Sequence, residues 1–310
     1  MRIGVIDFGT NTLRLDIFET DEQRYQSIFD YAIYSRIVEN TVGTSLCQDG
    51  IEHIIQAIEE HQQACRHYRC DRVECFSTAS LRYIDNADDV LEQVFFRTGI
   101  KIRMISGDEE ARYDYLALKS VVSEEKGIGC DLGGGSFQIF TFDENGPIKS
   151  ESFPLGSSRT SKRFVKGSIP TENEVAAIKE CVSSSLSESG FGSFAGETLF
   201  AMGGTAKAIK SLYNTVISKG DVITLKELDL MIKLLCEKPD EAVELISDIA
   251  PKRIKTLVPG MCVLSSAMKK NGCDKMKIYP VGVREGFLET ILSGELKKEP
   301  TLLDIIMGNI

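Results

Sequence analysis

The fold of this chain is decided by a glycine-rich stretch near its middle, Asp131-Leu132-Gly133-Gly134-Gly135-Ser136-Phe137-Gln138, which lies between two segments of strand character. The chain opens on the same pattern, Asp7-Phe8-Gly9-Thr10-Asn11-Thr12-Leu13-Arg14, again between two apolar segments. When the copies are aligned, the paired positions are Asp7 with Asp131, Gly9 with Gly133, Thr12 with Ser136 and Arg14 with Gln138. Two copies of strand, acid, glycine turn, hydroxyl and strand predict an internal duplication.

Each copy has the composition of a phosphate-binding hairpin. Glycines permit positive φ and a close approach of the main chain to a ligand, and successive N–H groups form an anion-binding concavity. Thr12 or Ser136 adds a hydroxyl donor, and Asp7 or Asp131 can hold a cation or a water beside the phosphate. A strand follows each turn, whereas a Walker loop needs a helix. Two ordinary glycine hairpins are the alternative, but the matched acids favour phosphate binding.

The composition restricts the class of protein. With 310 residues, 42% hydrophobic and 26% charged, the chain can form two globular domains, each with its own core. A formal charge of -10 argues against a sequence-independent nucleic-acid binder, which needs a basic face. Nine cysteines without a C-x-x-C pair indicate reduced thiols and a cytoplasmic location. We expect no membrane partner, because no secretory leader and no apolar run of membrane-spanning length is present.

The order of the predicted elements indicates the α/β class. Strands are expected at 2–8, 12–19, 25–35, 73–77 and 100–105, with a helix capped by Asp49, a second at about 87–98 and a third beginning at the Ser106 capping box. The second glycine loop restarts this order, with strands near 127–131, 136–142, 147–154, 198–201 and 275–279. Capping boxes at Thr171 and Thr224 begin two further helices, and two more are expected near 256–271 and 284–293. The polar stretch 122–126 is the predicted domain boundary.

A few side chains outside the loops can carry chemistry. Glu110 follows the capping-box glutamate in the first turn of its helix, where acidic residues also simply complement the helix dipole. Arg82 and Arg159 each lie just beyond a strand end, where α/β sheets bind ligands, although either can be a solvated surface arginine. Gly204 and Thr205 begin a helix and form a third phosphate-compatible position. Histidines and cysteines between 53 and 75 lack a standard zinc spacing, so we interpret them as part of an amphipathic helix with stray thiols.

Taken together, the motifs resemble the exopolyphosphatase/guanosine pentaphosphate phosphohydrolase (Ppx/GppA) family of the actin-like ATPase and sugar kinase superfamily. The resemblance covers essentially the whole chain. Its ordered motifs are the two glycine loops, Thr78-Ala79-Ser80-Leu81-Arg82 with Asn86, Ile105-Ser106-Gly107-Asp108-Glu109-Glu110-Ala111-Arg112, Pro154-Leu155-Gly156-Ser157, Gly203-Gly204-Thr205-Ala206 and Val283-Arg284-Glu285-Gly286.

The resemblance implies two duplicated actin-like (ribonuclease H-like) domains with a central cleft. The first would span 1–122, completed by a C-terminal helix at about 298–310, and the second 123–297. It implies hydrolysis of terminal phosphate from polyphosphate or pppGpp, helped by Mg²⁺ at Asp7 and Asp131. Glu110, Asp131 and Arg82 would be catalytic. The implied phosphate-binding residues are Gly9, Thr10, Asn11, Thr12, Arg14, Gly133, Gly134, Gly135, Ser136, Gly204 and Thr205.

Three departures from the family pattern leave alternatives open. Gln138 stands where the family has glutamate, which removes a charge that would hold Mg²⁺. Lys255 in Arg253-Ile254-Lys255 replaces an acid, and the chain resembles the short form of the family. A polyphosphate or (p)ppGpp-binding sensor with weakened catalysis is therefore the second hypothesis, and an ATP-dependent, sugar-kinase-like phosphotransferase is the third. The sequence leaves open the preferred phosphate substrate and whether the protein forms a homodimer.

Overall fold

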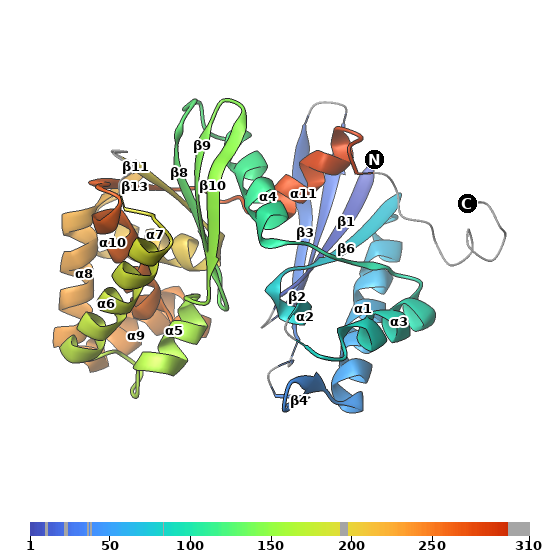
Figure 1. Cartoon of the computed structure of the whole chain (residues 1–310), viewed down its shortest axis with the longest axis horizontal. Coiled ribbons are helices and arrows are strands. Elements are labelled where there is room, and N and C mark those ends of the chain that lie inside the picture. Colours follow the sequence, from blue (N-terminus) through green and yellow to red (C-terminus); the bar gives the residue numbers. More distant parts are fainter. Residues whose placement is uncertain are drawn as a thin grey trace. The chain divides into compact units, whose positions relative to one another are not determined.

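The structure is a computed structural model, and it describes residues 1–9, 12–21, 24–35, 37, 39–82, 84–192 and 198–296. The chain divides into two compact units, Met1–Glu110 with Phe287–Ile310 and Ala111–Gly286. Each unit is built on its own β-sheet (Figure 1), so the predicted α/β class is confirmed. The C-terminal helix expected at about 298–310 lies outside the described residues.

The first unit contains a five-stranded sheet in the order β3-β2-β1-β6-β7. The three strands β3, β2 and β1 are antiparallel, and β6 and β7 continue the sheet parallel to β1. Apolar side chains of β1 and β2 on one face pack against α1 and α3, which lie side by side in Figure 1. The elements are β1 (Arg2–Phe8), β2 (Thr12–Thr20), β3 (Tyr25–Tyr34), β4 (Thr41–Val42), β5 (Ser45–Leu46), α1 (Gln48–His67), β6 (Arg72–Ser77), α2 (Ala79–Arg82), α3 (Ala87–Thr98) and β7 (Ile102–Met104).

The second unit repeats this arrangement in a six-stranded sheet of order β10-β9-β8-β11-β13-β12. Helix α10 is the centre of its helical layer, because residues Leu257–Met268 are all buried and the helix packs against α5, α6, α7 and α8. The elements are β8 (Gly127–Leu132), β9 (Phe137–Asp143), β10 (Gly146–Phe153), α5 (Ser157–Phe164), α6 (Glu172–Glu188), β11 (Thr198–Met202), α7 (Gly203–Val216), β12 (Val222–Thr224), α8 (Leu225–Glu237), α9 (Pro239–Ile249), α10 (Leu257–Lys270) and β13 (Lys275–Ile278). Helices α4 (Gly107–Lys119) and α11 (Val283–Leu292) each contain one of the two divisions between the units.

The two glycine hairpins share one main-chain geometry. In the first, Asp7 pairs with Arg14 across the β1–β2 ladder, and in the second Asp131 pairs with Gln138 across β8–β9. The turn is closed in each case by the corresponding bond: Gly9 N–H donates to the Thr12 carbonyl at 3.0 Å, and Gly133 N–H donates to the Ser136 carbonyl at 3.1 Å. The internal duplication predicted from the sequence is therefore present at the level of single hydrogen bonds.

The outer strands of the two hairpins carry a matching irregularity. The β2–β3 ladder shifts register between Ile17 and Phe18, which leaves Ile28 of β3 without a cross-strand partner. The β9–β10 ladder shifts between Pro147 and Lys149, which leaves Ile148 of β10 in the same situation. One extra residue in the outer strand is the signature of a β-bulge.

Most of the predicted elements are present, with a few corrections. The capping boxes at Ser106, Thr171 and Thr224 form as expected. The prediction that Asp49 caps a helix is wrong: the helix begins at Gln48 after Cys47, and Asp49 lies in its first turn. Helices α5 and α9 and the short edge strand β12 were not predicted, because the two helices lack a capping box and β12 has only three residues.

Candidate functional site

The second glycine loop is held by the first turn of α5. Ser157 N–H donates to the Gly133 carbonyl at 2.9 Å, and Ser158 and Arg159 N–H donate to the Gly134 carbonyl at 2.9 and 3.1 Å. The Gly133 and Gly134 carbonyls therefore face α5. Among the residues that the structure describes, the N–H groups of Gly134, Gly135 and Ser136 donate to no other protein group. Successive unpaired N–H groups of this kind form an anion-binding concavity.

Gly156 makes this close approach possible. It is the residue before α5, and a β-carbon there would lie 2.5 Å from the Gly134 carbonyl carbon and oxygen and would also meet the Ser136 nitrogen. Any larger residue would have to displace the loop, because these neighbours are main-chain atoms that cannot rotate away. The absent side chain of Gly156 is thus what lets α5 set the position of the loop.

A chain of side chains connects the loop to the start of α7. Arg253 donates from its guanidinium to the Thr205 hydroxyl at 2.9 Å, the Thr205 and Ser157 hydroxyls lie 3.0 Å apart, and Ser157 Oγ donates to the Gly133 carbonyl at 3.2 Å. Arginine can only donate, so the proton order runs from Arg253 through Thr205 and Ser157 to Gly133. Thr205 and Ser157 are fully buried. The network therefore connects the second glycine loop to Arg253 through two buried hydroxyls and helps to hold the loop in place.

Asp131 ends β8 beside a second group of glycines. Gly203, with φ of +90°, lies against Asp131 Oδ1, and a β-carbon at this position would overlap that oxygen. A β-carbon on Gly282 would lie 3.5 Å from Asp131 Oδ2 and 3.9 Å from Glu285 Oε2. Glu285 Oε2 accepts the Gly282 N–H at 2.9 Å. The Asp131 and Glu285 carboxylates thus both lie near Gly282.

These donors fit Mg²⁺, which prefers oxygen ligands and is usually held by one or two carboxylates together with substrate phosphates and water. Within the described residues, no group of three or more histidine, cysteine, aspartate or glutamate side chains can hold a metal by itself. Asp131 and Glu285 would therefore share the ion with a phosphate ligand. Asp7, the other residue expected to hold a metal, ends β1 in the first unit, where it pairs with Arg14 in the β-ladder.

Gln138 occupies a buried position across the β8–β9 ladder from Asp131. It is 3% exposed, and its Nε2 donates to the hydroxyls of Ser136 at 2.8 Å and Ser152 at 3.3 Å. The side-chain amide therefore positions the loop hydroxyl, which a carboxylate would do only by accepting from it. Gln138 thus positions the loop hydroxyl without placing a negative charge beside Asp131.

The first glycine loop has fewer described contacts. Gly9 and Thr12 close the turn, whereas Thr10 and Asn11 lie outside the described residues. Arg14 forms an ion pair with Asp30 of β3: its Nε donates to Asp30 Oδ1 at 2.7 Å, and its Nη2 contacts Oδ2. This bond is the largest cause of the raised pKa of Arg14. The guanidinium is therefore held over the β2–β3 ladder and keeps its charge.

Two consecutive glutamates at the start of α4 have different surroundings. Glu109 is exposed and accepts the Ser106 N–H at 2.8 Å, so it completes the capping box. Glu110 is 6% exposed and takes no part in that cap with its side chain. Capping thus accounts for Glu109 but not for the burial of Glu110. Of Arg82 only the main chain, at the end of α2, is described, and Arg159 is exposed on α5.

Comparisons with known proteins show the family to which this chain belongs. The model of the Ppx/GppA phosphatase family matches residues 17–295. The chain belongs to the Ppx/GppA phosphatase family. Exopolyphosphatase 1 of Mycobacterium leprae is 24% identical over 95% of this chain and 91% of its own length. The phosphatase family member of Aquifex aeolicus superposes with a TM-score of 0.83 at 24% identity, covering 96% of this chain and 99% of that one, and an exopolyphosphatase from Cytophaga hutchinsonii with 0.79 at 17%, covering 95% and 98%.

Membership of the Ppx/GppA phosphatase family confirms the resemblance inferred from the motifs and the actin-like fold. No role was assigned from the sequence to Gly156, Ser157, Arg253 or Glu285, although all four lie in quoted motifs. The pair Gly156-Ser157, shortly after the strand predicted at 147–154, was the available sequence signal for the contact between the loop and the start of α5. Nothing in the sequence predicted that Arg253, far along the chain, bonds Thr205, because that contact depends on tertiary packing.

Proposed function

We propose that the protein is a phosphoanhydride hydrolase that releases terminal orthophosphate from inorganic polyphosphate, with the 5′-phosphate of pppGpp as the second substrate class. The observation that carries this proposal is the fixed orientation of the second glycine loop. The Gly133 and Gly134 carbonyls are bound by α5, so the N–H groups of Gly134 and Gly135, on the opposite sides of the same trans peptide units, point away from α5 and are available to phosphate oxygens. The name of the mycobacterial relative supports polyphosphate as the first substrate to test.

In the proposed reaction, Glu110 accepts a proton from the attacking water. The water oxygen forms a bond to the terminal phosphorus as the bond to the bridging oxygen breaks, and orthophosphate leaves. Loop N–H groups and the hydroxyls of Thr12 and Ser136 bind the phosphate oxygens, and Arg82 neutralises their charge. Asp131 and Glu285 would hold Mg²⁺, which supplies charge neutralisation at the phosphate when bound. Thr205 and Arg253 act as positioning residues through Ser157.

The test is phosphate release from long-chain polyphosphate and from pppGpp by wild type, Glu110→Gln and Glu109→Gln. Loss of a general base costs on the order of 10²- to 10⁴-fold in rate, so Glu110→Gln is expected to lose turnover and to keep polyphosphate binding. Glu109→Gln removes the neighbouring charge but keeps a side-chain oxygen for the capping box, and it is expected to keep its activity. Equal turnover in wild type and Glu110→Gln would refute the assignment of the base.

A binding protein that senses polyphosphate or (p)ppGpp is the second candidate, and Gln138 is the observation that favours it. The amide supplies the contacts that position Ser136 but not the charge that would help to hold Mg²⁺. Tight binding of either ligand without phosphate release, in wild type as well as in Glu110→Gln, would select the sensor over the hydrolase.

A further inference from the structure

The C-terminal end of α1 brings two cysteines together. Arg69 N–H donates to the Arg66 carbonyl at 3.1 Å, and Cys70 N–H donates to the Cys65 carbonyl at 2.9 Å. With Arg69 in the left-handed region at φ of 54°, these bonds form a Schellman motif. In that motif the third-last helical residue and the second residue beyond the cap have their side chains in contact. Here the two positions are occupied by Cys65 and Cys70.

The backbone geometry of this pair is compatible with a disulfide. The Cα atom is about 2.4 Å from its carbonyl oxygen and about 1.5 Å from its nitrogen. A hydrogen bond of 2.9 Å from Cys70 to Cys65 therefore limits the separation of their Cα atoms to at most about 6.8 Å. Disulfides span Cα separations of about 4.4 to 6.8 Å. The turn thus needs little main-chain movement for the two sulfurs to bond.

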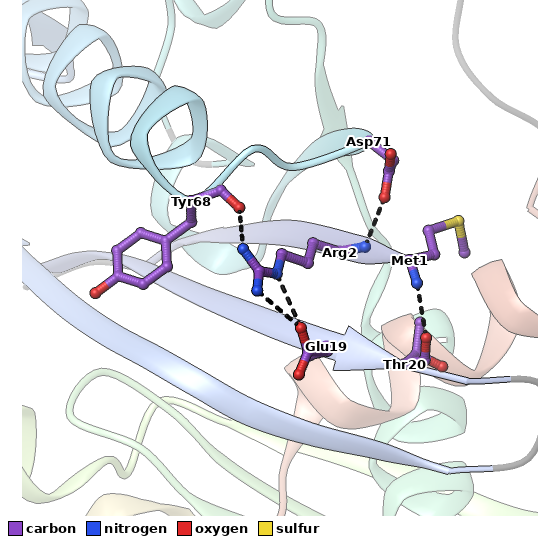
Figure 2. A network of polar contacts seen from close by, with 6 residues as sticks. All are labelled: Met1, Arg2, Glu19, Thr20, Tyr68 and Asp71. Atoms are coloured by element: carbon purple, nitrogen blue, oxygen red, sulfur yellow. Dashed lines mark hydrogen bonds and ion pairs between the residues drawn. The ribbon is translucent and has the colours of Figure 1, made fainter.

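The turn itself is held in place by Arg2 (Figure 2). The Arg2 guanidinium donates to the Tyr68 carbonyl at 2.8 Å and to Glu19 Oε1 at 3.0 Å, and the Arg2 main chain donates to Asp71 Oδ2 at 2.7 Å. Asp71 N–H in turn donates to the Arg2 carbonyl at 2.8 Å. A left-handed arginine costs conformational energy, and these bonds stabilise the turn that contains it.

The two thiols have different environments. Cys65 is buried at 3% exposure, and its Sγ lies against β1, where a β-carbon on Gly4 would be 2.7 Å away. Cys70 is only half-buried. The pKa of Cys70 is lowered, first by the hydrogen bond of the Cys65 thiol and further by the positive charge of Arg2. The same hydrogen bond raises the pKa of Cys65. An accessible thiol of lowered pKa next to a buried thiol is the arrangement of an attacking and a resolving cysteine.

We propose that Cys65 and Cys70 form a redox-responsive thiol pair that closes to an intramolecular disulfide when the protein meets a low-molecular-weight disulfide such as glutathione disulfide. The Cys70 thiolate attacks one sulfur of glutathione disulfide, which forms a mixed disulfide and expels one glutathione thiolate. Cys65 then attacks the Cys70 sulfur, its proton passes to solvent, and the second glutathione leaves. The protein loses two electrons and two protons, and glutathione disulfide becomes two molecules of glutathione.

The experiment treats the reduced full-length chain with glutathione disulfide, blocks the remaining thiols with N-ethylmaleimide and maps tryptic peptides by mass. Trypsin cuts after Arg66 and Arg69, between the two cysteines, so a disulfide would hold the peptide Cys70-Asp71-Arg72 to the peptide 37–66. Because peptide 37–66 also contains Cys47, the matched control is Cys47→Ser, in which the cross-link is expected to persist.

Two variants test the order of the steps. Cys65→Ser is expected to retain glutathione on Cys70, because the resolving thiol is gone, and Cys70→Ser is expected to form neither adduct nor cross-link. The site lies at the start of β1, and the Gly9 turn follows its end, about 20 Å away along the strand. Reduced Cys70→Ser should therefore release phosphate as wild type does. Stable glutathione on Cys70 in wild type, full alkylation of both cysteines, or loss of the cross-link in Cys47→Ser would overturn the proposal.

Discussion

At the scale of single residues, Gln138 determines how much negative charge lies beside the second loop. It is the cross-strand partner of Asp131, and its amide donates to Ser136 and Ser152. A glutamate at this position could accept from the same hydroxyls and would add a carboxylate next to Asp131. Neighbouring carboxylates repel one another unless a cation lies between them. The residue at this position thus affects both the contacts of the loop hydroxyl and the charge beside Asp131.

We therefore expect the Gln138→Glu substitution to raise the Mg²⁺ affinity and the Mg²⁺-dependent turnover several-fold. Phosphate release by the variant should also depend more strongly on Mg²⁺ than release by wild type does. The measurement is a Mg²⁺ titration of phosphate release, with a parallel titration of thermal stability. Removal of Mg²⁺ by a chelator should lower the melting temperature of the variant more than that of wild type. An unchanged Mg²⁺ response in both assays would show that the lost charge is compensated elsewhere.

Gly156 offers a second test at this scale, because its environment leaves no room for a methyl group. Gly156→Ala must displace the main chain of Gly134 or Ser136. A shift of about 1 Å at a catalytic group costs on the order of 10²-fold in rate, so kcat/KM for phosphate release should fall by about that factor. Gly220→Ala is the matched control, since its methyl group would meet only one ring atom of Tyr213, 4.0 Å away. Equal kcat/KM in the two variants would argue against a fixed loop.

At the scale of elements, α1 contains a buried histidine that is sensitive to pH. His61 is fully buried, and its Nε2 donates to the Leu13 carbonyl of β2 at 3.2 Å, because a carbonyl can only accept. Its Nδ1 bonds no group among the described residues. Burial lowers the pKa of His61 below its ordinary value of 6.5, against smaller opposing effects of the Leu13 bond and Glu60. The neutral ring is therefore the form that α1 and β2 accommodate.

The unfolded chain binds a proton at His61 at a higher pH than the folded chain does. The free energy of unfolding should thus fall as the pH drops below about 6.5, by at most about 1.4 kcal/mol per pH unit for this group. Urea unfolding between pH 7.5 and 5 measures the slope. His61→Gln, which keeps a donor for Leu13, should flatten this slope, whereas His67→Gln at the exposed end of α1 should not. A slope that survives in His61→Gln would assign it to other groups.

Some elements of the fold follow from local sequence patterns, whereas others depend on tertiary packing. The hairpins, the parallel strands and the capped helices α4, α6 and α8 follow from period and capping residues, which act locally. Helix α5 was missed because its eight residues are mostly polar and its N-terminal N–H groups are bound by the carbonyls of the glycine loop. The Arg253–Thr205 bond joins residues 48 positions apart, so it depends on packing that no local pattern encodes.

At the scale of the whole molecule, the duplication joins two hairpins of equal geometry but different charge. The cross-strand partner of the hairpin aspartate is Arg14 for Asp7 and Gln138 for Asp131. Arg14 is neutralised by Asp30, whereas the Gln138 amide donates to the hydroxyls of Ser136 and Ser152. The two copies have therefore diverged in their side chains while keeping their turns. No helix within the described residues is long and apolar enough to cross a lipid bilayer.

The bulges in β3 and β10 affect how readily strands of two copies of this protein pair at high concentration. An outer strand exposes a row of main-chain donors and acceptors that can template a strand of another molecule and so begin aggregation. Ile28 in β3 and Ile148 in β10 interrupt that row at one point in each unit and increase the local twist. Both outer strands are consequently poor templates for sheet growth between molecules. Both copies of the hairpin thus share, together with the glycine turn, a feature that opposes fibrous assembly.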